Sequence, residues 1–171
     1  METASFDVEK DILDALRKDA ELKQIPLKTY IGIICSDYIR WYAKAPKAGM
    51  IPLPKELLIK IMDSVPTEEI SQIAEYTGRV TTKDINLIQR QEHTIKSFMD
   101  VLESWAKTTN FPFSHRDVND IHSYVIHHGM GKKWALFFEE VFKTILEELG
   151  LKKIKFDITD NSISFSFDLN G

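Results

Sequence analysis

The sequence predicts an α+β fold, in which an N-terminal strand–helix–helix module is followed by a helical segment and a small strand–helix–hairpin α/β layer. Three observations predict it. Apolar and polar residues alternate up to Val8, and apolar residues then recur at steps of three and four. Similar helical spacings continue to about Lys107. Two alternating segments separated by Asp160-Asn161 form a hairpin near the C-terminus.

The first forty-five residues are expected to form a strand and two helices. Alternation over residues 4–8 is typical of a short strand with one buried face, and Ile12, Leu16 and Ala20 lie on one side of a helix. Pro26 suits the first turn of a second, strongly apolar helix that ends near Pro46. So short a segment cannot bury a core alone, and a single strand has no partner. We therefore expect a second copy, with the two strands paired antiparallel across a twofold axis.

Three features of this module match a known family. They are the strand that ends at Val8, the helical pair Leu16 and Ala20, and the turn and second-helix start over residues 24–31. The stretch from Phe6 to Tyr42, about a quarter of the chain, resembles the ribbon-helix-helix module of Arc- and MetJ-type repressors. Two positions depart from the family pattern: Gln24 stands where the turn usually has Gly, and Pro26 stands where the second helix usually has a Ser or Thr cap.

The resemblance implies a homodimeric transcription regulator that binds double-stranded DNA. In this family the outward face of the paired strands reads base edges in the major groove, and the start of the second helix holds a phosphate. The candidate DNA-binding residues are Thr3, Ser5 and Asp7 on the strand, the backbone N–H groups of Leu27, Lys28 and Thr29, and the added cations of Lys10, Lys23 and Lys28.

An alternative is a protein-interaction scaffold that uses the ribbon only to dimerise. Residues 1–50 contain eight basic and eight acidic residues, so the net charge of −4 lies in the rest of the chain. DNA-binding modules are usually basic. Asp7 would accept a hydrogen bond only from a cytosine amino group and would lie in the negative potential of the phosphates.

The middle of the chain is expected to be helical. Three prolines and a glycine between residues 43 and 54 predict a semi-extended linker, which places the module at 1–45, the linker at 46–54 and a C-terminal domain at 55–171. Short helices are expected around Leu57–Met62 and from Pro66 to Gly78. A long helix is expected from Thr81 to Lys107. Its apolar residues at steps of seven would pack on a partner helix or within the same subunit: Ile88, Ile95 and Leu102.

The C-terminal part predicts a sheet covered by one helix. A strand is expected over residues 121–128, a helix over 132–149, and a hairpin whose strands are residues 154–158 and 163–169. This region would supply further association or would sense a ligand or a partner protein.

Few residues suggest a chemical site. Four histidines lie within residues 115–128, but their spacing matches no zinc site. A glycine-rich turn leads into a helix and could cradle an anion, although glycines that only permit a tight turn are the alternative. No nucleophile elbow, P-loop or paired-carboxylate pattern predicts catalysis, and no cofactor is expected. The candidate anion- or ligand-binding residues are Gly129, Gly131, Lys132 and Lys133.

Composition indicates a cytoplasmic protein without a membrane partner. The chain is 43% hydrophobic and 28% charged, and no apolar run approaches the roughly 20 residues that cross a bilayer. The N-terminus lacks the pattern of a signal peptide. A single cysteine, Cys35, fits a reducing compartment and is expected to be a small core residue of the second helix.

Overall fold

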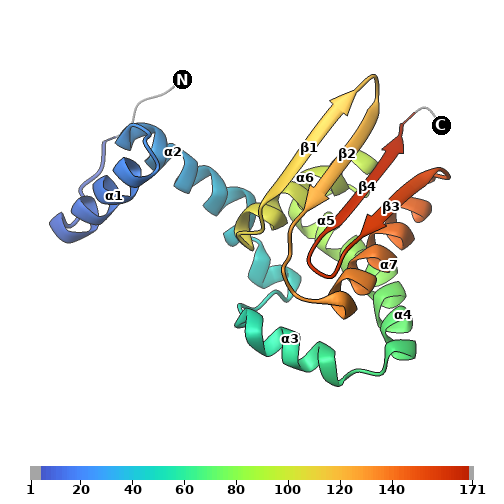
Figure 1. Cartoon of the computed structure of the whole chain (residues 1–171). Helices are drawn as coiled ribbons and strands as arrows, with labels where there is room; N and C mark the ends of the chain where they lie inside the picture. The colour runs from blue at the N-terminus through green and yellow to red at the C-terminus, as the bar shows by residue number, and fades with distance from the viewer. Residues whose placement is uncertain (1–4, 170–171) are drawn as a thin grey trace. The chain divides into compact units, whose positions relative to one another are not determined.

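The computed structural model describes residues 5–169. The chain divides into two compact units, Met1–Ala43 and Lys44–Gly171. The fold combines helices with a four-stranded antiparallel sheet, as expected for the α+β class, and all four strands lie in the second unit (Figure 1). Thr3 lies outside the described residues. Residues 5–9 have no regular secondary structure in the single chain, so the paired ribbon remains a prediction.

The first unit is a helix pair. Helix α1 (Lys10–Leu22) and helix α2 (Leu27–Asp37) agree with the two predicted helices, and α2 continues into the π-helical turn η1 (Tyr38–Tyr42). Gln24 lies between them with a positive φ of 55°. The Gln24 N–H donates to Glu21 O and the Ile25 N–H to Ala20 O, which is the Schellman pattern that closes a helix. Gln24 thus takes the left-handed conformation that the family usually assigns to Gly.

The second unit begins with short helical pieces. The 3-10 helix η2 (Ala45–Ala48) is followed by residues 50–54 without regular structure and by α3 (Lys55–Ser64). Lys44 donates a hydrogen bond of 2.6 Å to the backbone oxygen of Gln89, which ties the start of this unit to its helices.

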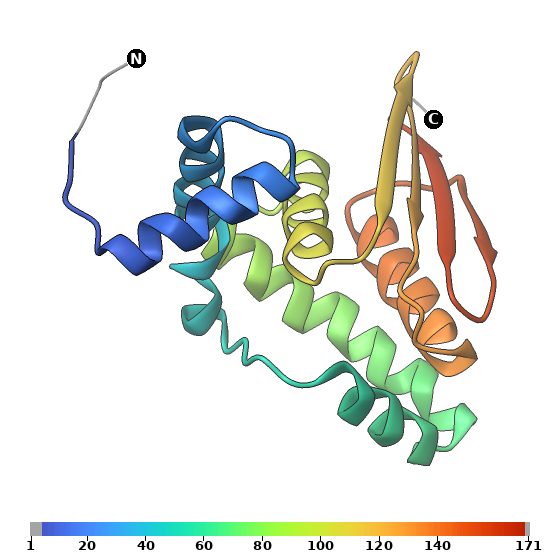
Figure 2. The same ribbon diagram turned by 60° about the vertical axis from the view of Figure 1, so that its left-hand side comes forward.

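Helix α4 (Thr67–Tyr76), the π-helical turn η3 (Thr77–Thr81) and α5 (Thr82–Arg90) form one continuous helical rod (Figure 2). The prediction that Gly78 ends a helix is therefore wrong. Gly78 is buried within the rod, where a Cβ atom would lie 2.8 Å from Thr144 Cβ and 3.0 Å from Val141 O. The glycine permits a close helix crossing instead of a helix end.

The predicted long helix from Thr81 to Lys107 is also wrong, because it breaks after Arg90. Gln91 has a φ of 61°, and α6 (Ile95–Thr108) starts anew at a capping box in which Thr94 and Ser97 each accept from the other's backbone N–H. The apolar residues seven apart therefore belong to two helices and do not form one stripe.

The sheet has the strand order β1-β2-β4-β3, with β1 (Phe113–Val118), β2 (Ile121–Ile126), β3 (Ile154–Ile158) and β4 (Ile163–Asp168). The C-terminal hairpin is confirmed, and so is α7 (Lys132–Glu148). Strand β1 was missed, so the expected strand–helix–hairpin is a hairpin–helix–hairpin. Asn119 and Asp120 both have positive φ and make the tight turn that joins β1 to β2.

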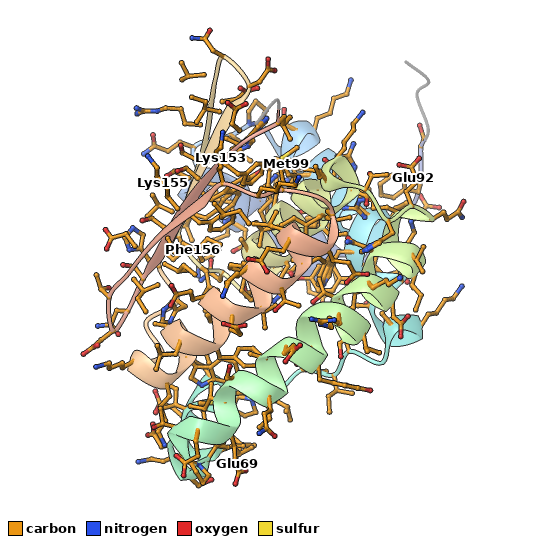
Figure 3. All side chains as sticks on the ribbon, turned by 90° about the vertical axis from the view of Figure 1, so that its right-hand side faces the viewer. Glu69, Glu92, Met99, Lys153, Lys155 and Phe156 are labelled. Carbon is orange, nitrogen blue, oxygen red and sulfur yellow. The ribbon has the colours of Figure 1, made fainter. Side chains whose placement is uncertain are left out.

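Helix α7 lies between the sheet and the α4–α5 rod (Figure 3), and α6 covers the β1–β2 end of the same sheet face. Alternate residues of β4, namely Ile163, Phe165 and Phe167, are buried on that face. Helix α7 contributes Phe138, Phe142 and Ile145 to the same core. No helix among the described residues is both long enough and apolar enough to cross a membrane.

Candidate functional site

The predicted DNA-binding residues of the described part lie on the surface of the first unit. Ser5, Asp7 and Lys10 are exposed at and before the start of α1. The first turn of α2 contains Leu27, Lys28 and Thr29, of which the last two are exposed, and no side chain caps this helix end. Backbone N–H groups at an uncapped helix start can donate to a phosphate.

The first unit also exposes much apolar surface. Ala20 is the only buried residue of α1, and α2 has none, so Cys35 is exposed and the prediction of a core cysteine is wrong. Phe6 is 64% exposed, Leu22 74% and Ile39 62%. Beside α2 runs a groove of about 400 Å³, lined by Lys23, Ile25, Tyr30, Ile33, Ile34, Asp37, Tyr38 and Tyr42.

The predicted anion-binding turn leads from β2 into α7. Gly129 and Gly131 have positive φ, and the Gly129 N–H donates to Asn161 O in the β3–β4 turn. Lys133 is engaged elsewhere, because its Nζ donates to the backbone oxygens of Asp63 and Val65 at the end of α3. Lys132 is exposed at the first position of α7.

Sequence reasoning missed Lys55, which contributes a second cation to this turn. A Cβ atom at Gly129 would lie 3.1 Å from Lys55 Nζ, and the same ammonium group lies 5.6 Å from the centre of the Phe111 ring. Lys55 is seventy-four positions before the glycine, and only the packing of α3 brings the two together.

His128 is buried inside the turn. Its Nδ1 accepts from the Met130 N–H at 3.1 Å, and its buried Nε2 has no hydrogen-bond partner. The ring meets Phe138 edge to face. Burial, and then the positive charge of Lys55, lower the pKa of His128 from 6.5 to about 4. His128 is therefore a neutral interior group at physiological pH.

A chain of titratable side chains joins α6 to the β1–β2 hairpin. His115 Nδ1 lies 2.8 Å from Glu103 Oε1, His115 Nε2 lies 2.9 Å from His122 Nδ1, and His122 Nε2 lies 4.0 Å from Asp117 Oδ2. His122 is buried, and His115 is partly buried. The four histidines are visible in the sequence, but strand β1 was not predicted. Because the pairing of β1 with β2 is what places His115 beside His122, this contact was not predicted either.

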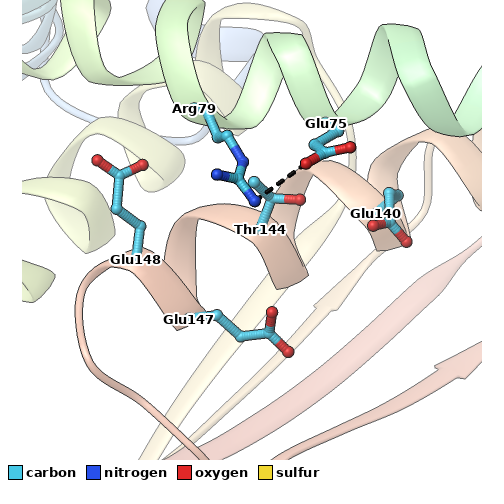
Figure 4. Close-up of a pocket in the computed structure, with 6 residues that line it drawn as sticks. All are labelled: Glu75, Arg79, Glu140, Thr144, Glu147 and Glu148. Atoms are coloured by element: carbon cyan, nitrogen blue, oxygen red, sulfur yellow. Dashed lines mark ion pairs between the residues drawn. The ribbon is translucent and has the colours of Figure 1, made fainter.

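An acidic groove of about 520 Å³ lies between the helical rod and α7 (Figure 4). Arg79 pairs with Glu75 at 2.9 Å, and Lys83 approaches Glu148 at 3.4 Å. Such a surface favours cations over anions. The lining residues are Glu75, Arg79, Glu140, Thr144, Glu147 and Glu148.

No group of three or more His, Cys, Asp or Glu side chains within residues 5–169 is arranged to hold a metal ion. No protein-family model matches the chain, and no curated protein matches it at a significant level.

Proposed function

We propose that the protein is a homodimeric, cytoplasmic DNA-binding transcription regulator. Two N-terminal units pair as a ribbon-helix-helix module, and the C-terminal unit serves association or sensing. The observation that carries this proposal is the apolar surface of the first unit, where α1 and α2 together bury only Ala20.

A second copy of the chain is the partner that suits this surface best. Contiguous exposed apolar surface marks an interaction site, and a unit of forty-three residues is too small to build a core alone. Residues 5–9 are exposed or half-buried and carry the alternating pattern of a strand. Pairing with the same residues of a second chain would satisfy their backbone groups and would cover the Phe6 ring.

The polar groups that would remain on the outer face of a paired ribbon support contact with DNA. Ser5 and Asp7 alternate with Phe6, so they would face away from the buried side of a paired ribbon. The uncapped start of α2 and the exposed Lys28 suit a backbone phosphate.

The second candidate is a scaffold that dimerises without binding DNA. It is favoured by the acidic Asp7 and by the balanced charge of residues 1–50. The substitution Asp7→Lys distinguishes the two functions. In a scaffold it does not harm self-association and can create DNA affinity. In a regulator that contacts bases through Asp7, it reduces the preference for one DNA sequence over others.

Fluorescence polarisation of the full chain with double-stranded DNA, repeated over a salt series, tests DNA binding. We expect affinity to fall as salt rises, and Lys10→Ala with Lys28→Ala to weaken binding and reduce the slope by about one per lost phosphate contact. Lys152→Ala, an exposed lysine of the second unit, is the control. Binding that is absent at low salt, or unchanged by the double substitution, contradicts the DNA-binding proposal and leaves the scaffold.

A further inference from the structure

The two faces of the sheet are built from different residues. Helices α6 and α7 cover one face, which carries the aromatic and aliphatic side chains of the core (Figure 3). The other face, named here the open face, consists of the alternate residues of each strand, and none of these residues is buried. Its middle, on the central strands β2 and β4, is rich in short polar side chains: Ser123, Ser164 and Ser166.

Strand pairing aligns four polar residues of the open face in one row across all four strands. Arg116 of β1 pairs with Ser123 of β2, which pairs in turn with Ser166 of β4. Lys155 of β3 pairs with Ser166 from the other side. Paired side chains of neighbouring strands start about 5 Å apart, so two hydroxyl groups lie side by side with one cation beyond each of them. These four residues are named here the serine row.

The polar groups of the serine row are not used within the chain. Among residues 5–169, the side chains of Arg116 and Lys155 make no ion pair or hydrogen bond, and the hydroxyls of Ser123 and Ser166 make no hydrogen bond. In the next row, by contrast, the Ser164 hydroxyl donates to the backbone oxygen of Asp157 at 3.2 Å. The serine row therefore presents two unused hydroxyl donors between two unpaired cations.

We propose that the serine row binds one tetrahedral oxyanion, a phosphate group, between the hydroxyls of Ser123 and Ser166. Each hydroxyl donates to a different oxygen of the anion. The Arg116 guanidinium and the Lys155 ammonium extend inward from the two edge strands and neutralise its charge, and the planar guanidinium can donate to two oxygens at once. The inference does not depend on DNA binding by the first unit.

The charges on either side of the serine row favour a single anion over a polyanion. Asp157 lies in the row on one side, where it pairs with Ser164, and Asp168 lies in the row on the other side, where it pairs with Ile121. The strand residues of the open face thus carry two cations against two carboxylates, which leaves no excess positive charge to hold a nucleic acid. A nucleic-acid strand that followed the β-strands would also bring its phosphates near these carboxylates. A single phosphate group stays within the row.

Amide NMR of the full chain during titration with inorganic phosphate tests the proposal, with sodium chloride at equal ionic strength as the reference. We expect saturable shift changes at Ser123 and Ser166, with a dissociation constant in the millimolar range because exposed ion pairs contribute little. Shift changes confined to residues 129–132 would place the anion at the turn before α7 and would reject the serine row. The absence of saturable changes would reject it as well. Double-stranded DNA that shifts these amides when phosphate does not would overturn the choice of a single anion.

Matched variants separate a built site from general attraction by surface charge. Ser123→Ala with Ser166→Ala keeps both cations but removes both hydroxyl donors, and should weaken phosphate binding about tenfold. Arg116→Gln should weaken it as well, because one of the two positive charges is lost. Ser164→Ala in the next row and Lys132→Ala in the turn before α7 should leave the affinity unchanged. An unchanged affinity in the double serine variant would show that charge alone attracts phosphate and would overturn the proposal.

Discussion

At the scale of single residues, His128 shows how the interior selects a protonation state. Its Nδ1 accepts from the Met130 N–H, which leaves the hydrogen of the neutral ring on a buried Nε2. A second proton would place a charge in this interior near the ammonium group of Lys55.

We predict that the free energy of unfolding falls as the pH drops from 6.5 towards 4, because the folded state keeps His128 neutral while the unfolded state binds the proton. The pKa of His128 is about 4 in the folded state and 6.5 in the unfolded state, so the free energy of unfolding falls by roughly 3 kcal/mol between pH 6.5 and pH 4. Above pH 6.5 this histidine makes no difference to it. Urea unfolding at several pH values measures the loss. His128→Asn retains an acceptor for the Met130 N–H and should flatten this dependence, whereas the exposed His127→Asn should not. Equal pH slopes for His128→Asn and the parent would refute the assignment.

Glutamines occupy two helix ends that usually belong to glycine. Gln24 follows α1 with φ 55°, and Gln91 follows α5 with φ 61°. An L-residue in this region pays a local conformational cost that tertiary contacts offset. Glutamine is a good helix former, so a glutamine in the sequence does not indicate the end of a helix. For this reason Gln91 did not predict the end of α5. The capping pair Thr94 and Ser97 was the better sign.

At the scale of elements, the crossing of the helical rod over α7 depends on one missing side chain. Gly78 is buried against Thr144 and the backbone of Val141 at distances that leave no room for a methyl group. At this crossing the α4–α5 rod packs on α7, and the other side of α7 packs on the sheet. The distance between the two helices therefore affects the packing of the whole second unit.

Gly78→Ala should destabilise the second unit by about 1–3 kcal/mol, because the added Cβ would lie 2.8 Å from Thr144 Cβ and the helices must move apart. The gain in helix propensity, about 1 kcal/mol, acts in the opposite direction and is smaller than the steric cost. Thermal or urea unfolding measures the change. Ser71→Ala on the exposed side of α4 changes propensity without a new contact and should be neutral or slightly stabilising. A Gly78→Ala variant as stable as the parent would show that the crossing is loose.

At the scale of the whole molecule, the two units are built differently. The second unit has a continuous core of aromatic and aliphatic residues from its sheet, α6 and α7. The helices of the first unit carry apolar faces that the single chain leaves open, among them Ile33, Ile34 and Tyr38. Covering that surface is the physical reason for the proposed dimer.

Sedimentation velocity of the full chain should give a dimer of twice 19.8 kDa at micromolar concentration. Ile34→Glu places a charge in the groove beside α2 and should weaken self-association at least tenfold without unfolding the second unit, which circular dichroism would verify. Ile73→Glu is the control, since Ile73 on α4 is 44% exposed and Ile34 is 39% exposed. A chain that remains monomeric at tens of micromolar would remove the basis of the proposed function.

The local patterns of the sequence determined most helices, the C-terminal hairpin and the α+β class, because hydrophobic period and turn chemistry act over a few residues. The same patterns missed β1, whose burial on one face is incomplete and whose turn uses Asn119 and Asp120 without glycine. Strand pairing then decided which histidines meet, and helix packing decided that Lys55 lies beside Gly129 and that Lys133 caps α3. These contacts join residues far apart in the chain, and their geometry depends on how whole elements pack, which no local pattern encodes.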